Sequence, residues 1–137
     1  MFPDWMKNAP TPFSSVLVAN RGEIAVRIIK AAKESGLKGI AIYSEPDKNS
    51  LHVEIADDSV YLPGDNLTDT YLNMESIISA AKKSGAEAIH PGYGFLSERA
   101  NFAKLVKDSG LIWIGPSSEA IETMGDKISA RRRMIES

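Results

Sequence analysis

Short runs of β-branched and other apolar residues alternate along this chain with longer segments in which apolar residues recur at helical spacing. The longer segments predict a helix that ends at Gly36, a helix between Asn73 and Gly85, and a helix that Ser97 caps and Gly110 ends. A short helical turn is expected over residues 51–56. The apolar runs predict strands over residues 15–19, 39–43, 59–62, 87–90 and 111–114. This alternation is typical of an α/β fold, a parallel sheet of about five strands flanked by helices.

The two ends of the chain differ from this pattern. Residues 1–13 contain Pro3, Pro10 and Pro12 and no apolar h-region, so we expect a flexible tail rather than a signal peptide. Helical spacing returns over 118–124 and from residue 126, yet the sequence stops at Ser137 without a helix-ending glycine. We therefore expect a domain over residues 14–125, the start of a connection to a further domain over 126–137, and a chain that is a fragment.

Composition narrows the classes of protein. The 137 residues, 43% of them hydrophobic and with a formal net charge of −2, suit one globular domain with its own core. The absence of cysteine excludes disulfides, thiolate metal sites and cysteine nucleophiles, and agrees with a reducing, cytoplasmic location. No apolar run approaches the ~20 residues that cross a membrane, and the near-neutral charge argues against nucleic-acid binding.

The turn after the first expected strand is one candidate for chemistry. In dinucleotide-binding folds this turn carries three glycines that approach a pyrophosphate, whereas here the segment 19–23 contains only Gly22. A plain strand-to-helix turn is therefore the favoured interpretation. Glu45 and Asp47 follow the second strand, where such folds place a ribose-binding acid, but acidic residues are common in loops.

A second candidate is the segment from His90 to Glu98, just past the fourth expected strand. Ligands bind at the carboxyl ends of the strands in open α/β sheets. Gly92 and Gly94 would let backbone amides approach a ligand that the ring of Tyr93 covers, or they would only permit an irregular loop. His90 ends an apolar strand, a position typical of a hydrogen-bonded structural histidine rather than a base or ligand.

A third candidate is Lys127, which follows Met124, Gly125 and Asp126. A lysine in the first turn of a helix opposes the helix dipole unless an anion such as phosphate compensates it. The alternative is a solvated lysine beside Asp126. Arg131 to Arg133 form a basic run, which is more typical of a hydrated face than of a nucleic-acid contact. No P-loop, HExxH motif or acid–histidine cluster at metal spacing is present, so neither metal ligands nor a complete active site is expected.

Four segments in register resemble the amino-terminal domain of biotin carboxylase, which also opens the biotin-dependent acetyl-CoA, propionyl-CoA and pyruvate carboxylases. The likeness runs from about Ser14 to Ser137, and residues 71–73 and 77–81 add to it. The four segments are residues 18–25, 90–98, 114–116 and 124–127.

The resemblance implies a Rossmann-like domain of the pre-ATP-grasp type, preceding an ATP-grasp domain. The family's enzymes are ligases that use ATP and Mg²⁺ to activate bicarbonate and transfer a carboxyl group to biotin. By resemblance, Lys127 contacts the ATP phosphates, while Tyr93 and Gly94 lie beside the biotin ring, with the Gly94 amide as a hydrogen-bond donor. No catalytic residue of the family falls within this chain.

The resemblance also implies partners: the ATP-grasp and C-terminal domains of the same enzyme, a biotin carboxyl carrier, a carboxyltransferase, and a second copy in a homodimer. Arg27, Lys30 and Glu34 match positions near the family's dimer contact. We expect the fragment alone to be inactive. The alternatives are a free-standing Rossmann-like nucleotide-binding module, a domain serving mainly dimerisation, and the N-terminal domain of another ATP-grasp ligase, against which the loop 90–98 argues.

Overall fold

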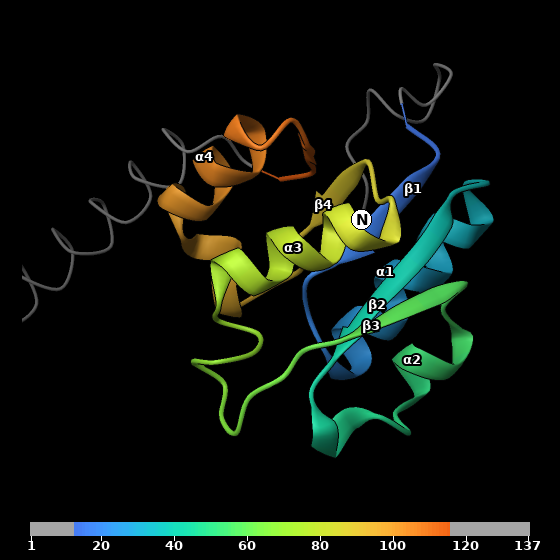
Figure 1. Cartoon of the computed structure of the whole chain (residues 1–137). Helices are drawn as coiled ribbons and strands as arrows, with labels where there is room; N and C mark the ends of the chain where they lie inside the picture. Colours follow the sequence, from blue (N-terminus) through green and yellow to red (C-terminus); the bar gives the residue numbers. More distant parts are fainter. Residues whose placement is uncertain (1–12, 116–137) are drawn as a thin grey trace, which may run out of the picture.

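The computed structural model describes residues 13–115, and five parallel strands form one sheet in the order β3-β2-β1-β4-β5 (Figure 1). The strands are β1 (Ser15–Val18), β2 (Lys38–Tyr43), β3 (Asp58–Tyr61), β4 (Ala88–His90) and β5 (Ile112–Trp113). The α-helices are α1 (Gly22–Glu34), α2 (Leu51–Ile55), α3 (Met74–Ser84) and α4 (Ala100–Asp108), and two 3-10 helices are η2 (Glu45–Asp47) and η3 (Phe95–Glu98). The predicted α/β fold is confirmed.

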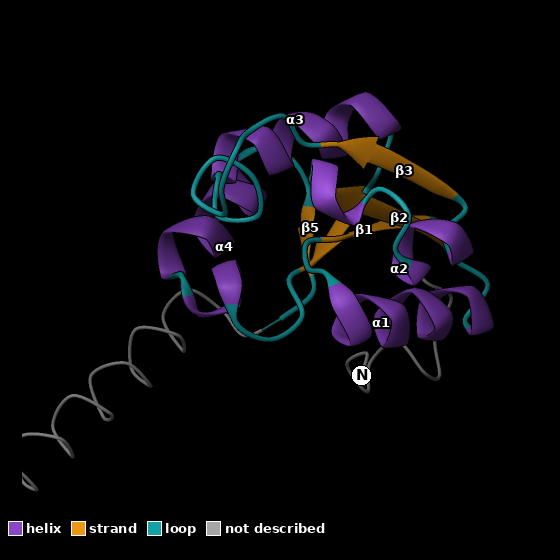
Figure 2. Ribbon diagram, turned by 90° about the horizontal axis from the view of Figure 1, so that it is seen from below, coloured by secondary structure: helices purple, strands orange, loops and turns teal. Residues whose placement is uncertain are grey.

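The direction in which the chain crosses the sheet reverses between β1 and β4. The chain steps from β1 outward to β2 and β3, then returns to the other side of β1 and continues to β5. Because crossovers between parallel strands are right-handed, the helices of the two halves lie on opposite faces. Accordingly α1 and α2 pack on one face, and α3 and α4 on the other (Figure 2). The carboxyl ends of β1 and β4 therefore flank the switch point at which open sheets bind ligands.

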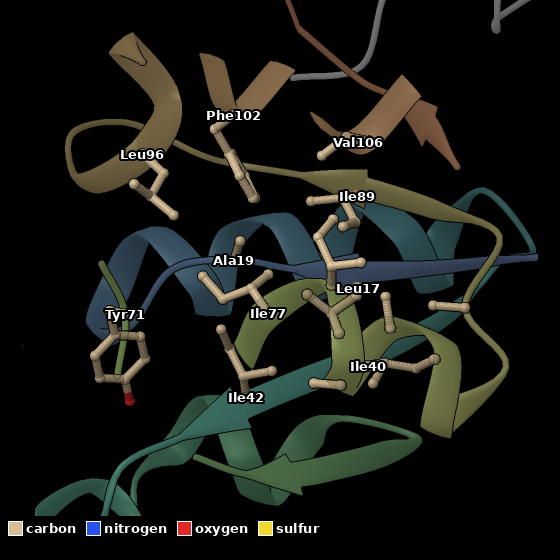
Figure 3. Packing of buried hydrophobic residues seen from close by; sticks show 14 of the residues in the cluster. Leu17, Ala19, Ile40, Ile42, Tyr71, Ile77, Ile89, Leu96, Phe102 and Val106 are labelled. Carbon is tan, nitrogen blue, oxygen red and sulfur yellow. The ribbon is translucent and has the colours of Figure 1, made fainter. Parts of the chain in front are cut away.

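Both faces of the inner strands β1, β2 and β4 are buried, which is why these strands are mainly apolar without alternation, whereas the edge strand β3 is partly exposed. Leu17 and Ile89 belong to the cluster packed against α3 and α4 (Figure 3), whereas Val18 and Ala41 pack against α1. Phe102 of α4 meets Trp113 of β5 edge to face, with ring centroids 5.6 Å apart. These layers hold the strand ends, and hence the loops that follow them, in fixed positions.

The helices α1, α3 and α4 end near the glycines that predicted their C-termini. At the end of α1, the Leu37 N–H donates to the Ala32 carbonyl at 2.9 Å and the Gly36 N–H to the Lys33 carbonyl at 3.1 Å. This pair of bonds satisfies carbonyls that the helix itself leaves unpaired. Corresponding pairs of bonds end α3 at Gly85 and α4 at Gly110. The predicted cap of α3 is also confirmed, since the Asn73 side chain accepts a 3.0 Å bond from the Ser76 N–H.

Two expectations are corrected. Ser97 does not cap a helix: it lies inside η3, its N–H donates to the Gly94 carbonyl at 3.0 Å, and α4 begins three residues later, at Ala100, with Arg99 in the cap position. Phe13, which we assigned to the tail, is buried at 3% exposure and packs with Val16 and Leu37, so the packed domain includes it. Residues 1–12, the helical segments expected from residue 118, Lys127 and the run 131–133 lie outside the described residues. No helix within residues 13–115 is both long and apolar enough to cross a bilayer.

Candidate functional site

One buried side chain joins the two loops that follow β1 and β4. Asn20 lies two residues after the end of β1 and is 0% exposed. Its Nδ2 donates to the Pro91 carbonyl at 3.0 Å and to the Tyr93 carbonyl at 2.8 Å, while its Oδ1 accepts from the Arg21 N–H at 2.8 Å. The turn 19–23 and the segment 90–98, two separate candidates in the sequence, are thus parts of one structure.

The loop that Asn20 holds has an unusual backbone. Gly92 and Gly94 both have φ of +69°, and Phe95 follows with φ of +49°. A Cβ at Gly92 would lie 2.7 Å from the Asn20 Nδ2, so that position excludes any side chain. Gly94 combines its φ with ψ of −165°, a region that only glycine readily occupies, and a Cβ there would meet no atom within 4 Å.

The loop presents an aromatic ring and a main-chain donor to the outside. Tyr93 is 66% exposed, which is unusual for a large aromatic side chain in a domain with a complete core. The neighbouring Gly94 is also exposed, and its N–H has no hydrogen-bond partner among residues 13–115. A planar ligand that carries a carbonyl acceptor fits this pairing, since the ring can cover its face while the N–H binds its oxygen.

His90, the last residue of β4, is buried and bonds to the loop that follows. It is 7% exposed, and its Nδ1 accepts a 3.1 Å bond from the Gly92 N–H. That bond fixes the first residue of the loop against the end of β4. His90 therefore shapes the loop through its ring.

A second polar cluster lies at the carboxyl end of β2, and the sequence did not reveal it. Asp47 is 6% exposed; one carboxylate oxygen accepts from the Arg21 guanidinium at 2.6 Å and the other from the Tyr71 hydroxyl at 2.7 Å. The Tyr71 oxygen accepts in turn from the Ser44 N–H at 3.1 Å. Asp47 is thus buried and bonded through both oxygens to groups of the domain itself, which gives it a structural role, and the exposed Glu45 accepts from the Lys48 ammonium at 3.1 Å.

The ionisation of this cluster follows from its contacts. Burial by itself would raise the pKa of Asp47, but the hydrogen bonds from Arg21 and Tyr71 outweigh it and hold that pKa below its ordinary value of 3.8. Burial and the hydrogen bond to Asp47 raise the pKa of Tyr71 to about 12. The pair is therefore a carboxylate and a neutral phenol throughout the physiological range.

The remaining candidate residues are spread over the surface or lie beyond the described part. Within residues 13–115, no group of three or more His, Asp or Glu side chains is placed to hold a metal ion. Arg27, Lys30 and Glu34 are exposed on α1, where Arg27 pairs with Glu23 at 3.0 Å. A groove of about 340 Å³ lies between the end of β3 and α3, and none of its lining residues belongs to the loop 91–99.

The fold and the candidate site define a class: a doubly wound α/β domain with a glycine-containing loop at the switch point of its sheet. Comparison with protein-family models gives the family. The model described as "Biotin carboxylase, N-terminal domain" matches residues 12–121. The chain belongs to this family.

Proteins of similar sequence agree with this family assignment. The biotin-dependent acyl-coenzyme A carboxylase alpha3 subunit of Mycobacterium leprae is 53% identical over 124 residues, which are 90% of this chain and 21% of the relative. Biotin carboxylase 1 of Bacillus subtilis is 50% identical over 119 residues, 87% of this chain and 26% of the relative.

Solved structures are similar as well. The K. lactis urea amidolyase superposes with a TM-score of 0.84 at 54% identity, covering 90% of this chain and 7% of that one. The biotin carboxylase domain dimer of the Hydrogenobacter thermophilus 2-oxoglutarate carboxylase, in complex with MgADP, ADP and bicarbonate, has a TM-score of 0.79 at 52% identity. It covers 85% of this chain and 25% of that one. The chain thus spans about a quarter or less of these relatives.

Proposed function

We propose that this chain is the N-terminal domain of a biotin-dependent carboxylase, a ligase that carboxylates biotin with ATP, Mg²⁺ and bicarbonate. One observation carries the proposal: the Gly94 N–H, which has no hydrogen-bond partner among residues 13–115, follows the exposed Tyr93 ring at the switch point of the sheet. Membership of the family and the MgADP and bicarbonate bound to a 52% identical structure support it. The domain's contribution is one side of a binding site.

The chemistry of biotin suits this side of the site. Its ureido ring is flat, and its carbonyl oxygen accepts hydrogen bonds. The Gly94 N–H would bind that oxygen, and the ring of Tyr93 would cover a face of the bicycle. A neutral hydrogen bond of this kind contributes about 1 kcal/mol, so the domain orients biotin and leaves the chemical step to residues outside it.

The groups that handle ATP are assigned to the rest of the protein. Residues 13–115 offer no cluster of metal ligands, so Mg²⁺ and the phosphates would be bound by the ATP-grasp domain with Lys127. Lys127 would hold a phosphate oxygen through its ammonium group. Phosphoryl transfer depends on a metal and several positioned cations, which is why the chain by itself is expected to be inactive.

The surface of α1 is assigned to assembly. Arg27, Lys30 and Glu34 are exposed along one helix and would face a second copy of the complete protein. The carrier that brings biotin and the carboxyltransferase that accepts the carboxyl group are further partners, and the cytoplasm is the proposed location.

The test compares two proteins, the complete polypeptide that contains this chain and the 137-residue chain alone. The complete protein should hydrolyse ATP in a bicarbonate-dependent manner and carboxylate free biotin, while the chain alone should fold and do neither. Hydrolysis without carboxylation of biotin in the complete protein would favour another ATP-grasp ligase. Activity of the isolated chain would contradict the assignment of the ATP site to other domains.

The binding role of Gly94 has its own test in the complete protein. We expect Gly94→Ala or Gly94→Val to reduce biotin carboxylation more than bicarbonate-dependent ATP hydrolysis, because the backbone that presents the donor is changed. Gly110→Ala is the matched control, since Gly110 also has positive φ (+80°) and an added Cβ there also meets nothing within 4 Å. Equal loss of both activities in the Gly94 variants would indicate a folding defect instead.

A further inference from the structure

We infer that Asn20 is the positioning residue that aims the Gly94 N–H at the ureido oxygen of biotin. This inference rests on the proposed function, because it concerns the same site. Asn20 touches neither substrate nor reacting atoms in our assignment; it acts through the peptide unit between Tyr93 and Gly94. The geometry that leads to it lies entirely within the described residues.

The first step is the orientation of one peptide plane. The Tyr93 carbonyl and the Gly94 N–H belong to the same trans peptide unit, in which the C=O and the N–H point in opposite directions. The Tyr93 oxygen is held at 2.8 Å by the Nδ2 of Asn20, which is completely buried. The Gly94 N–H therefore points away from Asn20, and Gly94 itself is exposed.

The second step is the rigidity of Asn20 itself. Both protons of its amide are used, one on the Pro91 carbonyl at 3.0 Å and one on Tyr93, and its oxygen accepts from the Arg21 N–H at 2.8 Å. An amide with three bonds in fixed directions cannot turn without breaking at least one of them. The Arg21 guanidinium in turn donates to the Asp47 carboxylate at 2.6 Å, which connects the turn after β1 to the segment after β2.

The third step is the anchor at the other end of the loop. Phe95 follows Gly94 with φ of +49°, a conformation that aromatic residues avoid, and its ring lies 5.8 Å from the ring of Tyr71. Strain at such a residue persists only where the surroundings hold it in place. The peptide unit 93–94 thus lies between two fixed points, and Asn20 supplies the one that sets its direction.

Loss of the Asn20 amide should therefore weaken the binding of biotin more than the use of ATP. Asn20→Asp keeps the oxygen that accepts from Arg21 but places a second oxygen against the carbonyl oxygens of Pro91 and Tyr93. Repulsion would turn the peptide unit 93–94 and misdirect the Gly94 N–H. We expect the KM for free biotin to rise about tenfold, the effect of one lost hydrogen bond of about 1.4 kcal/mol, with bicarbonate-dependent ATP hydrolysis within about twofold of wild type.

The experiment uses the complete polypeptide. Asn20→Ser, which is smaller and adds no charge, is measured in parallel in case the aspartate variant does not fold. Asn73→Ala is the matched control: it removes an asparagine that also bonds a backbone group, at 3.0 Å, but at the start of α3. The control should lower the melting temperature and leave the KM for biotin unchanged.

The outcomes separate this inference from the proposed function. A folded Asn20 variant with an unchanged KM for biotin, or with biotin carboxylation and ATP hydrolysis reduced equally, would overturn it. If the wild-type protein does not carboxylate biotin, the proposed function fails, and a crystal structure of Asn20→Asp decides the positioning role alone. A 93–94 peptide unit that keeps its direction in that structure would refute the inference, and one that has turned would support it.

Discussion

The buried carboxylate of Asp47 gives a stability prediction that the structure makes quantitative. Asp47→Asn keeps the shape of the side chain but removes its charge, and the amide can accept through only one oxygen. The wild-type residue accepts from Arg21 at 2.6 Å and from Tyr71 at 2.7 Å, and hydrogen bonds to charged groups contribute about 1.5 to 3 kcal/mol each. The variant therefore loses at least one of these bonds.

The solvent exposure of the two partners decides how much each hydrogen bond to Asp47 contributes to the free energy of unfolding. The Arg21 side chain is 42% exposed, so water screens its pairing with Asp47, and such pairs contribute about 1 kcal/mol or less. Tyr71 is 0% exposed, so the phenol–carboxylate bond is the larger part. We expect the free energy of unfolding to fall by about 2 kcal/mol, which for a domain of this size lowers the melting temperature by about 8 °C.

The assay is urea unfolding of the 137-residue chain followed by far-UV circular dichroism at several pH values. Because the pKa of folded Asp47 lies below 3.8, its stabilisation is complete above that value and is lost as the pH falls through the lowered pKa. Wild type and variant should therefore differ fully at pH 7 and converge in acid. Asp65→Asn, at an exposed carboxylate, should change stability by less than about 0.5 kcal/mol. A difference at pH 7 no larger than this control, or one that persists unchanged below the pKa of Asp47, would refute the reasoning.

Three further predictions follow from individual residues. Absorbance titration of the tyrosines should show a step near pH 12 that Tyr71→Phe removes. Because the pKa of folded Tyr71 is raised above 10, its stabilisation is complete below pH 10 and is lost as the pH rises through about 12. A wild-type protein without that step would contradict the hydrogen bond between Tyr71 and Asp47. Gly92→Ala should reduce the free energy of unfolding by about 3 kcal/mol, since the new Cβ meets buried atoms at 2.7 Å and 3.0 Å, against about 1 kcal/mol for Gly110→Ala; similar losses would show that the loop adapts. In the complete protein, Lys127→Ala should weaken the use of ATP by about 1.5 to 3 kcal/mol in kcat/KM, and unchanged kinetic constants would remove Lys127 from the site.

The pattern of the sequence was sufficient for the elements and their order. Apolar runs located all five strands to within a residue or so at each end, and the glycines at 36, 85 and 110 marked the helix ends. These signals are local, because a left-handed residue or an apolar run has the same meaning wherever the chain places it. Ser97 shows the limit of that rule: a good capping residue lies inside η3, while α4 begins after Arg99, which makes no side-chain cap bond.

The polar contacts of the site could not be predicted in the same way. Asn20 bonds to residues 71 and 73 positions away, and Asp47 bonds to partners 26 and 24 positions away. No periodicity encodes pairs at such separations, which depend on the order of the strands. The sequence interpretation therefore treated residues 19–23 as a plain strand-to-helix turn and did not identify Asn20; the one available signal was a polar residue shortly after a buried apolar strand.

A recognition group that belongs to the main chain has a consequence for how this protein can be studied and how it can change. Because every residue except proline carries a backbone N–H, most replacements at position 94 keep the donor and act only by changing the backbone conformation that presents it. Chemical synthesis offers a direct route. An ester linkage between positions 93 and 94 replaces the Gly94 N–H by an oxygen atom, which deletes the donor and leaves every side chain in place.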